Sequence, residues 1–279
     1  MRRLVAVATL AVLAGCSAST YDLAELAPET SSVVTAASPS PSAALAYVAR
    51  AHPRFDDNDP HDWQSRAPWH HPVHGTDVAK YQEYVDWQKV RTNGISFAFI
   101  KATEGGDIVD DYFERNWKAA RQAGIARGAY HFFYFCRPAI EQARWFIRNV
   151  PRDPNALPPV LDMEWNPFSP TCTKRPPAAK VQSEMRIFLE ALERHYGKKP
   201  IIYTSIDFFD DNRLENFKGY PYWLRSVAGH PDEKYGNHPF VFWQYTGTGV
   251  IPGIDGDADI NVFNGTKDEW RVWLAENTS

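Results

Sequence analysis

The sequence has few cysteines, no excess of basic residues and no long apolar run outside its N-terminal segment. Three cysteines among 279 residues are too few for a small scaffold held together by disulfides. Acidic residues outnumber basic ones by 34 to 30, which argues against a nucleic-acid partner, because such a partner requires a basic face. After the N-terminal segment, nothing is apolar and long enough to span a membrane.

The N-terminus has the pattern of an export signal. Arg2 and Arg3 precede an apolar run from Leu4 to Ala14, so residues 1–15 are predicted to be a signal peptide. Cys16 follows Leu-Ala-Gly, as in the lipobox of bacterial lipoproteins, and we expect lipid attachment to it. An ordinary signal peptide with an incidental cysteine is the alternative. Cleavage leaves 28 basic against 34 acidic residues, and the mature chain is expected to be exported and anchored by its lipid in the bacterial cell envelope, at the outer membrane or the cell surface.

Composition divides the rest of the chain into three parts. Residues 16–48 are rich in Ser, Ala and Pro without apolar periodicity, which predicts a flexible tether. Residues 49–73 carry four histidines in a spacing that fits no metal-ligand template, so they are predicted to be a lead-in segment that packs on the domain. The regular pattern of residues 74–279 predicts the folded domain, for which no metal and no cofactor are expected.

From residue 74, short β-rich runs alternate with amphipathic stretches. Eight strands are predicted, at 74–79, 96–102, 127–135, 158–164, 200–205, 221–227, 240–246 and 257–263. Helical spacing of apolar residues fills the early connections, loops join the last three strands, and a helix from Lys267 to Glu276 ends the chain. Strand–helix alternation implies parallel strands, and eight of them predict an α/β fold, an irregular TIM-like (β/α) barrel. An open doubly wound sheet is the alternative.

Two carboxylates, Asp162 and Glu164, end the apolar run of strand 158–164. Side chains two residues apart on a strand share a face, so both acids point to the side opposite Leu161 and Met163. Crowding by a second negative charge raises the pKa of one carboxyl, which can then hold a proton near neutral pH while its neighbour stays ionised. A lone D-x-E is more often a loop or capping feature, so the interpretation depends on its surroundings.

Further polar and aromatic residues fall at strand ends, which in a parallel barrel meet at one rim. Acids, aromatic faces and amides together suit a cleft that cleaves sugars. The candidates are Asp77, Glu104, His131, Tyr134, Tyr203, Trp243, Gln244, Tyr245 and Asp259. Tyr203 and Trp243 are also compatible with simple barrel filling. The acidic run 255–259 is not a calcium loop, because Ile260 and Thr266 stand where Gly and Glu are required.

Two cysteines, Cys136 and Cys172, remain if Cys16 carries lipid. In an oxidising compartment they can form a disulfide, and two free buried thiols are the alternative. Their separation and the lack of nearby histidine partners make them poor zinc ligands.

Several motifs in order resemble glycoside hydrolase family 25, the Chalaropsis-type lysozymes or N-acetylmuramidases. The matching segments are 75–78, 85–87, 97–105, 127–132, 160–164, 200–204, 243–246 and 259–261, within roughly residues 74–270. Ala79 and Glu83 stand where the family usually has Ser and Gly, which leaves the rim around the first strand uncertain.

The resemblance implies cleavage of the β-1,4 bond after N-acetylmuramic acid in peptidoglycan. By analogy Glu164 is the general acid, Asp162 orients the substrate acetamido group that attacks the anomeric carbon, and Asp77 and Asp259 shape the field. A spacing of roughly 6–7 Å between the Cα atoms of the acid pair is wide for a direct protein nucleophile and leaves inversion or substrate assistance. The partners expected are glycan strands and, through the lipid, a membrane; a monomer is expected. A non-catalytic lipid-anchored peptidoglycan-binding protein and a chitinase-like hydrolase are the alternatives.

Overall fold

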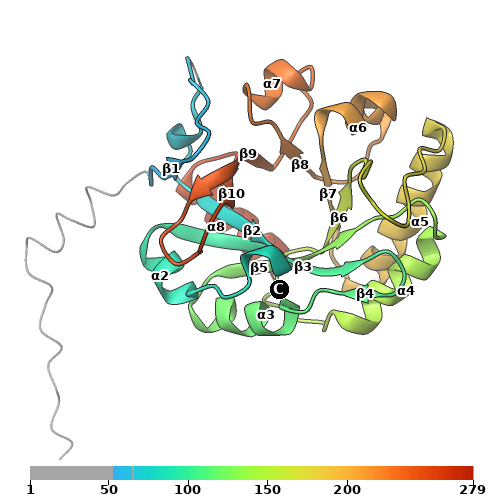
Figure 1. The fold of residues 1–279 in the computed structure, drawn as a ribbon, viewed down its shortest axis with the longest axis horizontal. Helices are drawn as coiled ribbons and strands as arrows, with labels where there is room; N and C mark the ends of the chain where they lie inside the picture. The colour runs from blue at the N-terminus through green and yellow to red at the C-terminus, as the bar shows by residue number, and fades with distance from the viewer. Residues whose placement is uncertain (1–52, 65, 279) are drawn as a thin grey trace, which may run out of the picture. The chain divides into compact units, whose positions relative to one another are not determined.

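The computed structural model describes residues 53–64 and 66–278, which form a closed eight-stranded barrel with helices packed around it (Figure 1). The barrel strands are β2 (His74–Val78), β3 (Ile95–Glu104), β5 (Ala126–Phe132), β6 (Val160–Met163), β7 (Ile201–Thr204), β8 (Tyr222–Arg225), β9 (Phe242–Val250) and β10 (Ala258–Phe263). Pairing of β10 with both β9 and β2 closes the sheet. The predicted irregular TIM-like barrel is therefore confirmed, whereas the signal peptide, Cys16 and the tether lie outside the described residues.

One barrel strand runs in the opposite direction to the other seven. The strands from β2 to β9 pair in parallel, but β10 is antiparallel to both β9 and β2. The expectation of parallel strands throughout is thus wrong for β10. The connection over residues 251–257 is too short for the crossover that parallel neighbours need, so the chain reverses there.

Helices fill the connections of the first part of the barrel, as the apolar spacing predicted. They are α2 (Trp87–Thr92), α3 (Phe113–Gln122), α4 (Ala139–Asn149) and α5 (Ala178–Tyr196). A further short helix after β7, α6 (Ile206–Asp211), was not predicted. A single helical turn, α7 (Pro231–Lys234), lies between β8 and β9, where only a loop was predicted; it begins at Pro231, a residue suited to the first helical position. The last helix is α8 (Lys267–Asn277).

Short strands and 3-10 turns lie outside the eight barrel strands. Strand β1 (Asp56–Asp57) pairs with β9, and β4 (Ile108–Val109) forms a hairpin with β3. Short 3-10 turns are η2 (Pro68–His70), η3 (Lys80–Gln82) and η4 (Leu214–Asn216). The described part of the lead-in segment packs on the outside of β9, where the ring of Trp63 lies 5.2 Å from that of Trp243.

Aromatic side chains fill the barrel at the end opposite the rim. Phe99 stacks on Trp223 with 4.6 Å between ring centroids, and Phe97 lies 4.9 Å from Phe242. Gly75 makes this packing possible, because a Cβ there would lie 2.3 Å from the Phe97 ring. Trp270 of α8 closes this end of the barrel, 5.4 Å from Phe97.

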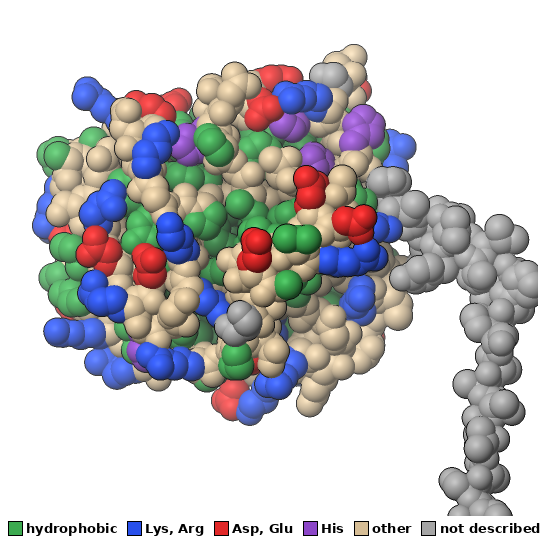
Figure 2. All heavy atoms as spheres, turned by 180° about the vertical axis from the view of Figure 1, so that it is seen from behind, with side chains coloured by type: hydrophobic (Ala, Val, Ile, Leu, Met, Phe, Trp, Pro, Cys, Tyr) green, Lys and Arg blue, Asp and Glu red, His purple; other side chains and the backbone are tan. Residues whose placement is uncertain are grey.

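The surface carries charges of both signs. On the face shown in Figure 2, basic and acidic side chains are interspersed around a hollow in which hydrophobic side chains are visible. Within residues 53–64 and 66–278, no helix has the length and apolar character needed to cross a membrane.

Candidate active site

Four carboxyl groups gather inside the barrel at the rim. Asp162 lies in β6, and Glu164 is the first residue after the end of that strand. Asp77 and Asp259 belong to the neighbouring strands β2 and β10. Asp77 and Asp259 are paired opposite each other, because the reversed direction of β10 brings its first residues to the rim where β2 ends. Burial raises the pKa of Asp259 well above its usual range, and the nearby charge of Asp77 raises it further. The four groups therefore form one electrostatic cluster.

Asp162 has a buried oxygen with no hydrogen-bond donor. The residue is 6% exposed, and its Oδ1 receives no hydrogen bond from any described residue. Burial raises the pKa of Asp162 well above its usual range, and the charge of Glu164 raises it further. An acceptor buried without a donor is costly, so this atom is suited to accept a hydrogen bond from a substrate N–H or O–H group.

Glu164 is half-buried at the end of β6, where burial and nearby cations shift its pKa in opposite directions. Burial raises its pKa to about 7, and the cations of Arg225 and Lys101 pull in the other direction. A carboxyl group with a pKa near 7 retains a proton at neutral pH and can give it to a leaving oxygen. Glu164 is therefore suited to general acid catalysis.

Amide groups hold Asp77 in place. Its Oδ1 accepts hydrogen bonds from Gln244 Nε2 at 2.9 Å and from Asn261 Nδ2 at 2.7 Å. Tyr203 donates its hydroxyl to Gln244 Oε1 at 2.8 Å, and Trp223 Nε1 donates to Asn261 Oδ1 at 2.8 Å. Burial raises the pKa of Asp77 to about 6, although the two amides stabilise the ionised form. This network fixes the orientation of one wall of the site.

A second polar group extends the rim along β3 and β5. Tyr134 donates its hydroxyl to Glu104 Oε1, and Lys101 Nζ lies 2.6 Å from Glu104 Oε2. Lys101 also lies over the Phe132 ring, 4.7 Å from its centroid. Burial opposes ionisation of Glu104, but the Lys101 charge outweighs it and lowers the pKa of this carboxyl. A register shift between Lys101 and Thr103 returns Glu104 to the side of Lys101.

His131, predicted to bind substrate, lies behind the sheet instead. It is completely buried, its Nδ1 is 2.7 Å from Thr103 Oγ1 and its Nε2 is 3.0 Å from Gln142 Oε1. Its ring stacks on Phe188 of α5. Side chains alternate along a strand, so Tyr130 faces the barrel interior and His131 faces the helices. The substrate-binding prediction for His131 is therefore corrected to a role in the core.

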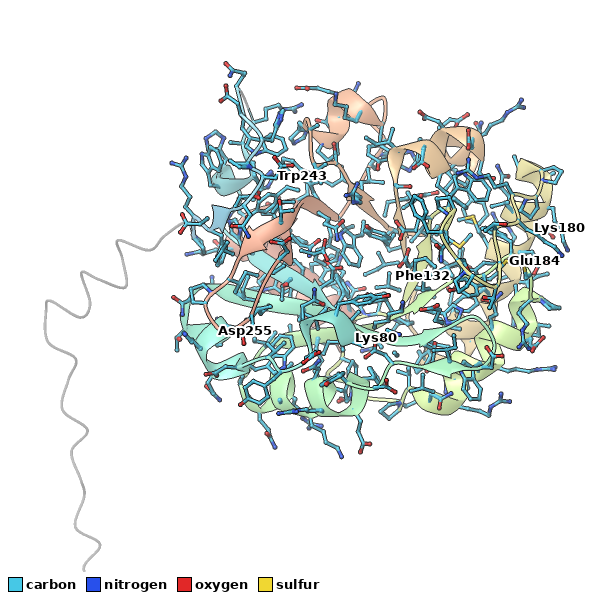
Figure 3. All side chains as sticks on the ribbon, in the orientation of Figure 1. Lys80, Phe132, Lys180, Glu184, Trp243 and Asp255 are labelled. Carbon is cyan, nitrogen blue, oxygen red and sulfur yellow. A yellow bond between two sulfur atoms is a disulfide. The ribbon has the colours of Figure 1, made fainter. Side chains whose placement is uncertain are left out.

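Trp243 and Tyr245 need the same correction. Trp243 is fully buried and donates Nε1 to the Ser226 carbonyl at 2.8 Å, and its ring packs on Trp63 (Figure 3). Tyr245 is 9% exposed and lies beside Trp243, on the same outer face. Only Gln244, between them, points into the barrel, where it bonds to Asp77. The amide and not the flanking aromatic rings reaches the site.

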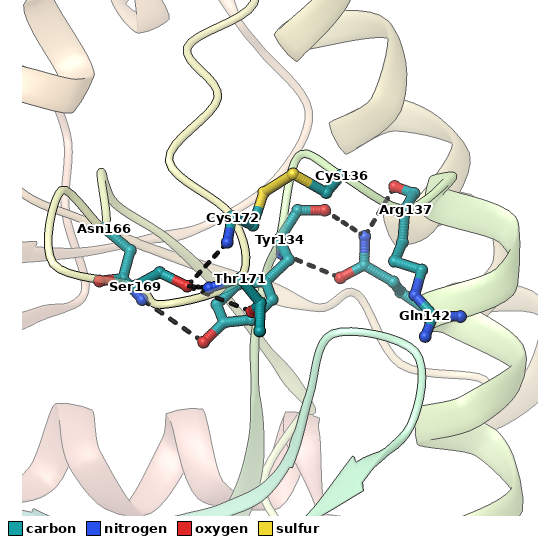
Figure 4. The surroundings of a disulfide bond; sticks show 8 residues. All are labelled: Tyr134, Cys136, Arg137, Gln142, Asn166, Ser169, Thr171 and Cys172. Carbon is teal, nitrogen blue, oxygen red and sulfur yellow. Dashed lines mark hydrogen bonds between the residues drawn. A yellow bond between two sulfur atoms is a disulfide. The ribbon is translucent and has the colours of Figure 1, made fainter.

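The structure joins Cys136 and Cys172 in a disulfide, with their Cα atoms 5.8 Å apart (Figure 4). The bond links the loop after β5 to the loop after β6, directly beyond the acid pair. Ser169 Oγ accepts a hydrogen bond from the backbone N–H of Cys172 at 3.0 Å, and Asn166 Nδ2 lies 3.5 Å from the Tyr134 hydroxyl. The crosslink thus fixes part of the rim.

Two residues of the site were missed by sequence reasoning. Arg225, the last residue of β8, places a positive charge that lowers the pKa of Asp77, Glu164 and Asp259 against the effect of burial. Asn261 holds Asp77. The predicted strand 221–227 extends two residues beyond the observed end of β8, so its last residue did not indicate Arg225, whereas Asn261 lies two residues after Asp259 on the same strand. Among the described residues, no group of three or more His, Cys, Asp or Glu side chains is arranged to hold a metal ion.

Two carboxyl groups at one end of a barrel, one able to give a proton and one able to support the developing charge, are the equipment of a glycoside hydrolase. The comparisons with known proteins agree with this class. Residues 76–254 match the model of the glycosyl hydrolases family 25, and the chain belongs to this family.

Several relatives resemble the chain over most of its length. An uncharacterized protein, YegX of Escherichia coli K12, is 39% identical over 214 residues, which are 75% of this chain and 76% of the relative. Lysozyme M1 of Streptomyces globisporus is 34% identical over 223 residues, covering 74% and 72%. The structure of a family 25 glycosyl hydrolase from Bacillus anthracis superposes with a TM-score of 0.68 at 36% identity, covering 78% of this chain and 98% of the other.

Proposed function

We propose that this glycoside hydrolase is a muramidase that cleaves the β-1,4 bond between N-acetylmuramic acid and N-acetylglucosamine in peptidoglycan. Relatives named as lysozyme and N,O-diacetylmuramidase support this substrate. The observation that carries the proposal is the buried Oδ1 of Asp162, which lacks a donor and lies next to Glu164. An N-acetyl sugar brings the missing donor in its amide N–H.

In the proposed reaction, the acetamido N–H of the muramic acid donates to Asp162 and its oxygen attacks the anomeric carbon. The bond to the leaving oxygen breaks as Glu164 transfers its proton to that oxygen. Asp162 stabilises the positive charge of the resulting oxazoline-type ring. Water then attacks the same carbon, gives its proton to Glu164 and restores the acetamido group, with net retention at the anomeric centre.

The free site and the loaded site differ in where the protons lie. Burial favours a protonated Asp162 in the free protein. A hydrogen bond donated to a carboxylate stabilises its charged form, so arrival of the acetamido N–H lowers the pKa of Asp162. Glu164 keeps its proton because burial holds its pKa near 7. Asp162 therefore releases its proton to solvent as the substrate binds, and the loaded site holds Asp162 as a carboxylate and Glu164 as a carboxylic acid.

Removal of either acid tests these roles. Glu164→Gln is expected to abolish clearing of a purified cell-wall suspension and release of reducing ends, because an amide has no proton to give. Asp162→Asn is expected to lower kcat by about 10²–10⁴-fold. Glu190→Gln, at an exposed position on α5, is the matched control and should retain full activity. Near-normal turnover by Glu164→Gln, with unfolding unchanged, contradicts the assignment of the acid.

Product stereochemistry and substrate choice separate the remaining possibilities. Proton NMR of the first product formed should show the β anomer, and an initial α product would rule out assistance by the acetamido group. Peptidoglycan should be cut in preference to chitin. Binding of cell walls without any release of reducing ends would instead identify a non-catalytic binding protein.

We further propose that the enzyme works while held at a membrane of the cell envelope. The Leu-Ala-Gly-Cys sequence ending at Cys16 supports lipid attachment, and residues 16–48 have the composition of a tether. One barrel contains all four acids of the cluster, which is compatible with function as a monomer.

A further inference from the structure

Large aromatic side chains lie exposed on the loops beside the acid cluster. Phe168, in the loop after β6, is 93% exposed, and Tyr81, in the loop after β2, is 75% exposed. Tyr134 belongs to the loop after β5 and is half-buried. Single exposed apolar residues are common on proteins, but three aromatic rings on loops of the same rim are a feature that needs a reason.

The loop that carries Phe168 is fixed on both sides. Cys172, four residues after Phe168, forms the disulfide with Cys136 (Figure 4). Ser169 Oγ accepts hydrogen bonds from the backbone N–H groups of Thr171 and Cys172. On the other side, Asn166 Nδ2 approaches the Tyr134 hydroxyl at 3.5 Å. A crosslinked loop that leaves its aromatic ring in solvent gains no burial from that ring, so core packing does not account for Phe168.

Tyr81 is held by the backbone of η3. The Lys80 N–H donates to Asp110 Oδ2 at 2.8 Å, and the Lys80 ammonium lies 5.7 Å from the Tyr81 ring centroid. The β3–β4 hairpin lies against both tyrosine loops: Asp110, just after β4, holds the N–H of Lys80 next to Tyr81, and a Cβ at Gly105, just after β3, would lie 3.2 Å from the Tyr134 ring. The three rings therefore belong to one section of the rim.

We propose that Tyr81, Tyr134 and Phe168 form a platform that binds a sugar unit of the glycan strand outside the pair that flanks the cleaved bond, and that the Cys136–Cys172 disulfide holds the platform in position. The inference rests on the proposed muramidase function and names an additional part of its substrate site. The platform is continuous with the acids through Tyr134, Glu104 and Lys101. Aromatic rings with a polar edge suit pyranose units, which present an apolar face and hydroxyl groups.

The decisive experiment compares long, peptide-free glycan strands with a disaccharide that contains only the cleaved bond. Phe168→Ala and Tyr81→Ala should each raise KM for the long strands roughly three- to ten-fold and leave kcat unchanged, since each removes one aromatic contact with a sugar away from the cleaved bond. Neither variant should change the kinetics on the disaccharide. Val272→Ala, at a 57% exposed position on α8, is the matched control and should leave KM and kcat unchanged on both substrates.

The double variant with Cys136→Ser and Cys172→Ser tests the positioning role of the disulfide. It should raise KM for long strands and keep kcat on the disaccharide, with thermal unfolding showing that the barrel remains folded at the assay temperature. An unchanged KM in Phe168→Ala would overturn the platform, as would an equal rise on both substrates. A rise seen only with peptide-bearing strands would assign the rings to the stem peptide and also overturn the proposal.

The outcome is separable from that of the proposed function. Wild-type protein that releases no reducing ends from any strand refutes the muramidase, and the platform is then tested by sedimentation of the protein with insoluble peptide-free glycan. Loss of that binding in Phe168→Ala supports the platform, and unchanged binding refutes it.

Discussion

Each carboxyl group of the cluster takes its properties from its immediate contacts. Asp77 is bonded by two amides, Glu164 lies near Arg225, and Asp162 has an oxygen without a donor. Three acids of similar intrinsic strength are therefore prepared for different tasks. Burial alone would protonate all of them, and the differences come from the neighbours that sequence distance does not reveal.

The pH dependence of activity follows from Glu164. The proton that it donates is lost as pH rises through its pKa of about 7, so kcat/KM should fall about ten-fold per pH unit above that value. Arg225→Gln removes a cation that stabilises the ionised form, so the alkaline limb should move to higher pH. Rate measurements between pH 5 and 9 check both statements. A limb that moves to lower pH in Arg225→Gln would contradict the assignment.

A second prediction concerns Asn261, which bonds both Asp77 and Trp223. Asn261→Ala leaves a buried carboxylate and a buried indole N–H each without one partner, so unfolding free energy should fall by about 1–3 kcal/mol. Urea denaturation measures the change. Asn264→Ala is the control, because the hydrogen bond of Asn264 to the Phe240 carbonyl is exposed and its loss should cost under about 0.5 kcal/mol.

The alternation of side chains along a strand explains which of the predicted site residues face the barrel interior. Asp162 and Glu164 lie two residues apart, and both belong to the barrel interior, as the period of a strand requires. The same period places His131 and Trp243 on the outer face, and a stricter reading of it was sufficient to exclude both from the site. The shift near Lys101 that brings Glu104 to the rim has no signal in the sequence, because a bulge depends on the partner strand.

The fold was accessible from the sequence where local signals were strong. Helical spacing of apolar residues predicted the helices between the early strands. Gly197, which adopts a left-handed conformation at φ 71°, marked the end of α5. The direction of β10 was not predicted, because it follows from the length of one loop and not from the composition of the strand.

Helix α8 provides a further prediction. Trp270 is 8% exposed and lies 5.2 Å from the Phe263 ring and 5.4 Å from Phe97. Trp270→Ala should lower the unfolding free energy by about 3–5 kcal/mol, because it opens a cavity at the closed end of the barrel. Val272→Ala on the same helix should change it by under about 0.5 kcal/mol. Equal, small effects of both would show that α8 does not seal the barrel.

For the whole molecule, the sequence makes a prediction that concerns residues outside the described part. If Cys16 carries lipid, the wild-type protein should incorporate labelled fatty acid and sediment with membranes. Cys16→Ala should lose the label and appear in the soluble fraction with unchanged activity on dissolved glycan, because the barrel itself is untouched. Membrane association that persists in Cys16→Ala would contradict the anchor.

The last barrel strand, β10, contributes residues to the acid cluster and also closes the barrel. Asp259 and Asn261 belong to β10, which is inserted between β9 and the first barrel strand. A nascent polypeptide that has passed Glu164 but not Phe263 leaves Asp77 without its amide from Asn261 and leaves the barrel unsealed. A chain truncated before residue 258 is therefore expected to lack hydrolase activity, because it has neither Asp259 nor the amide of Asn261.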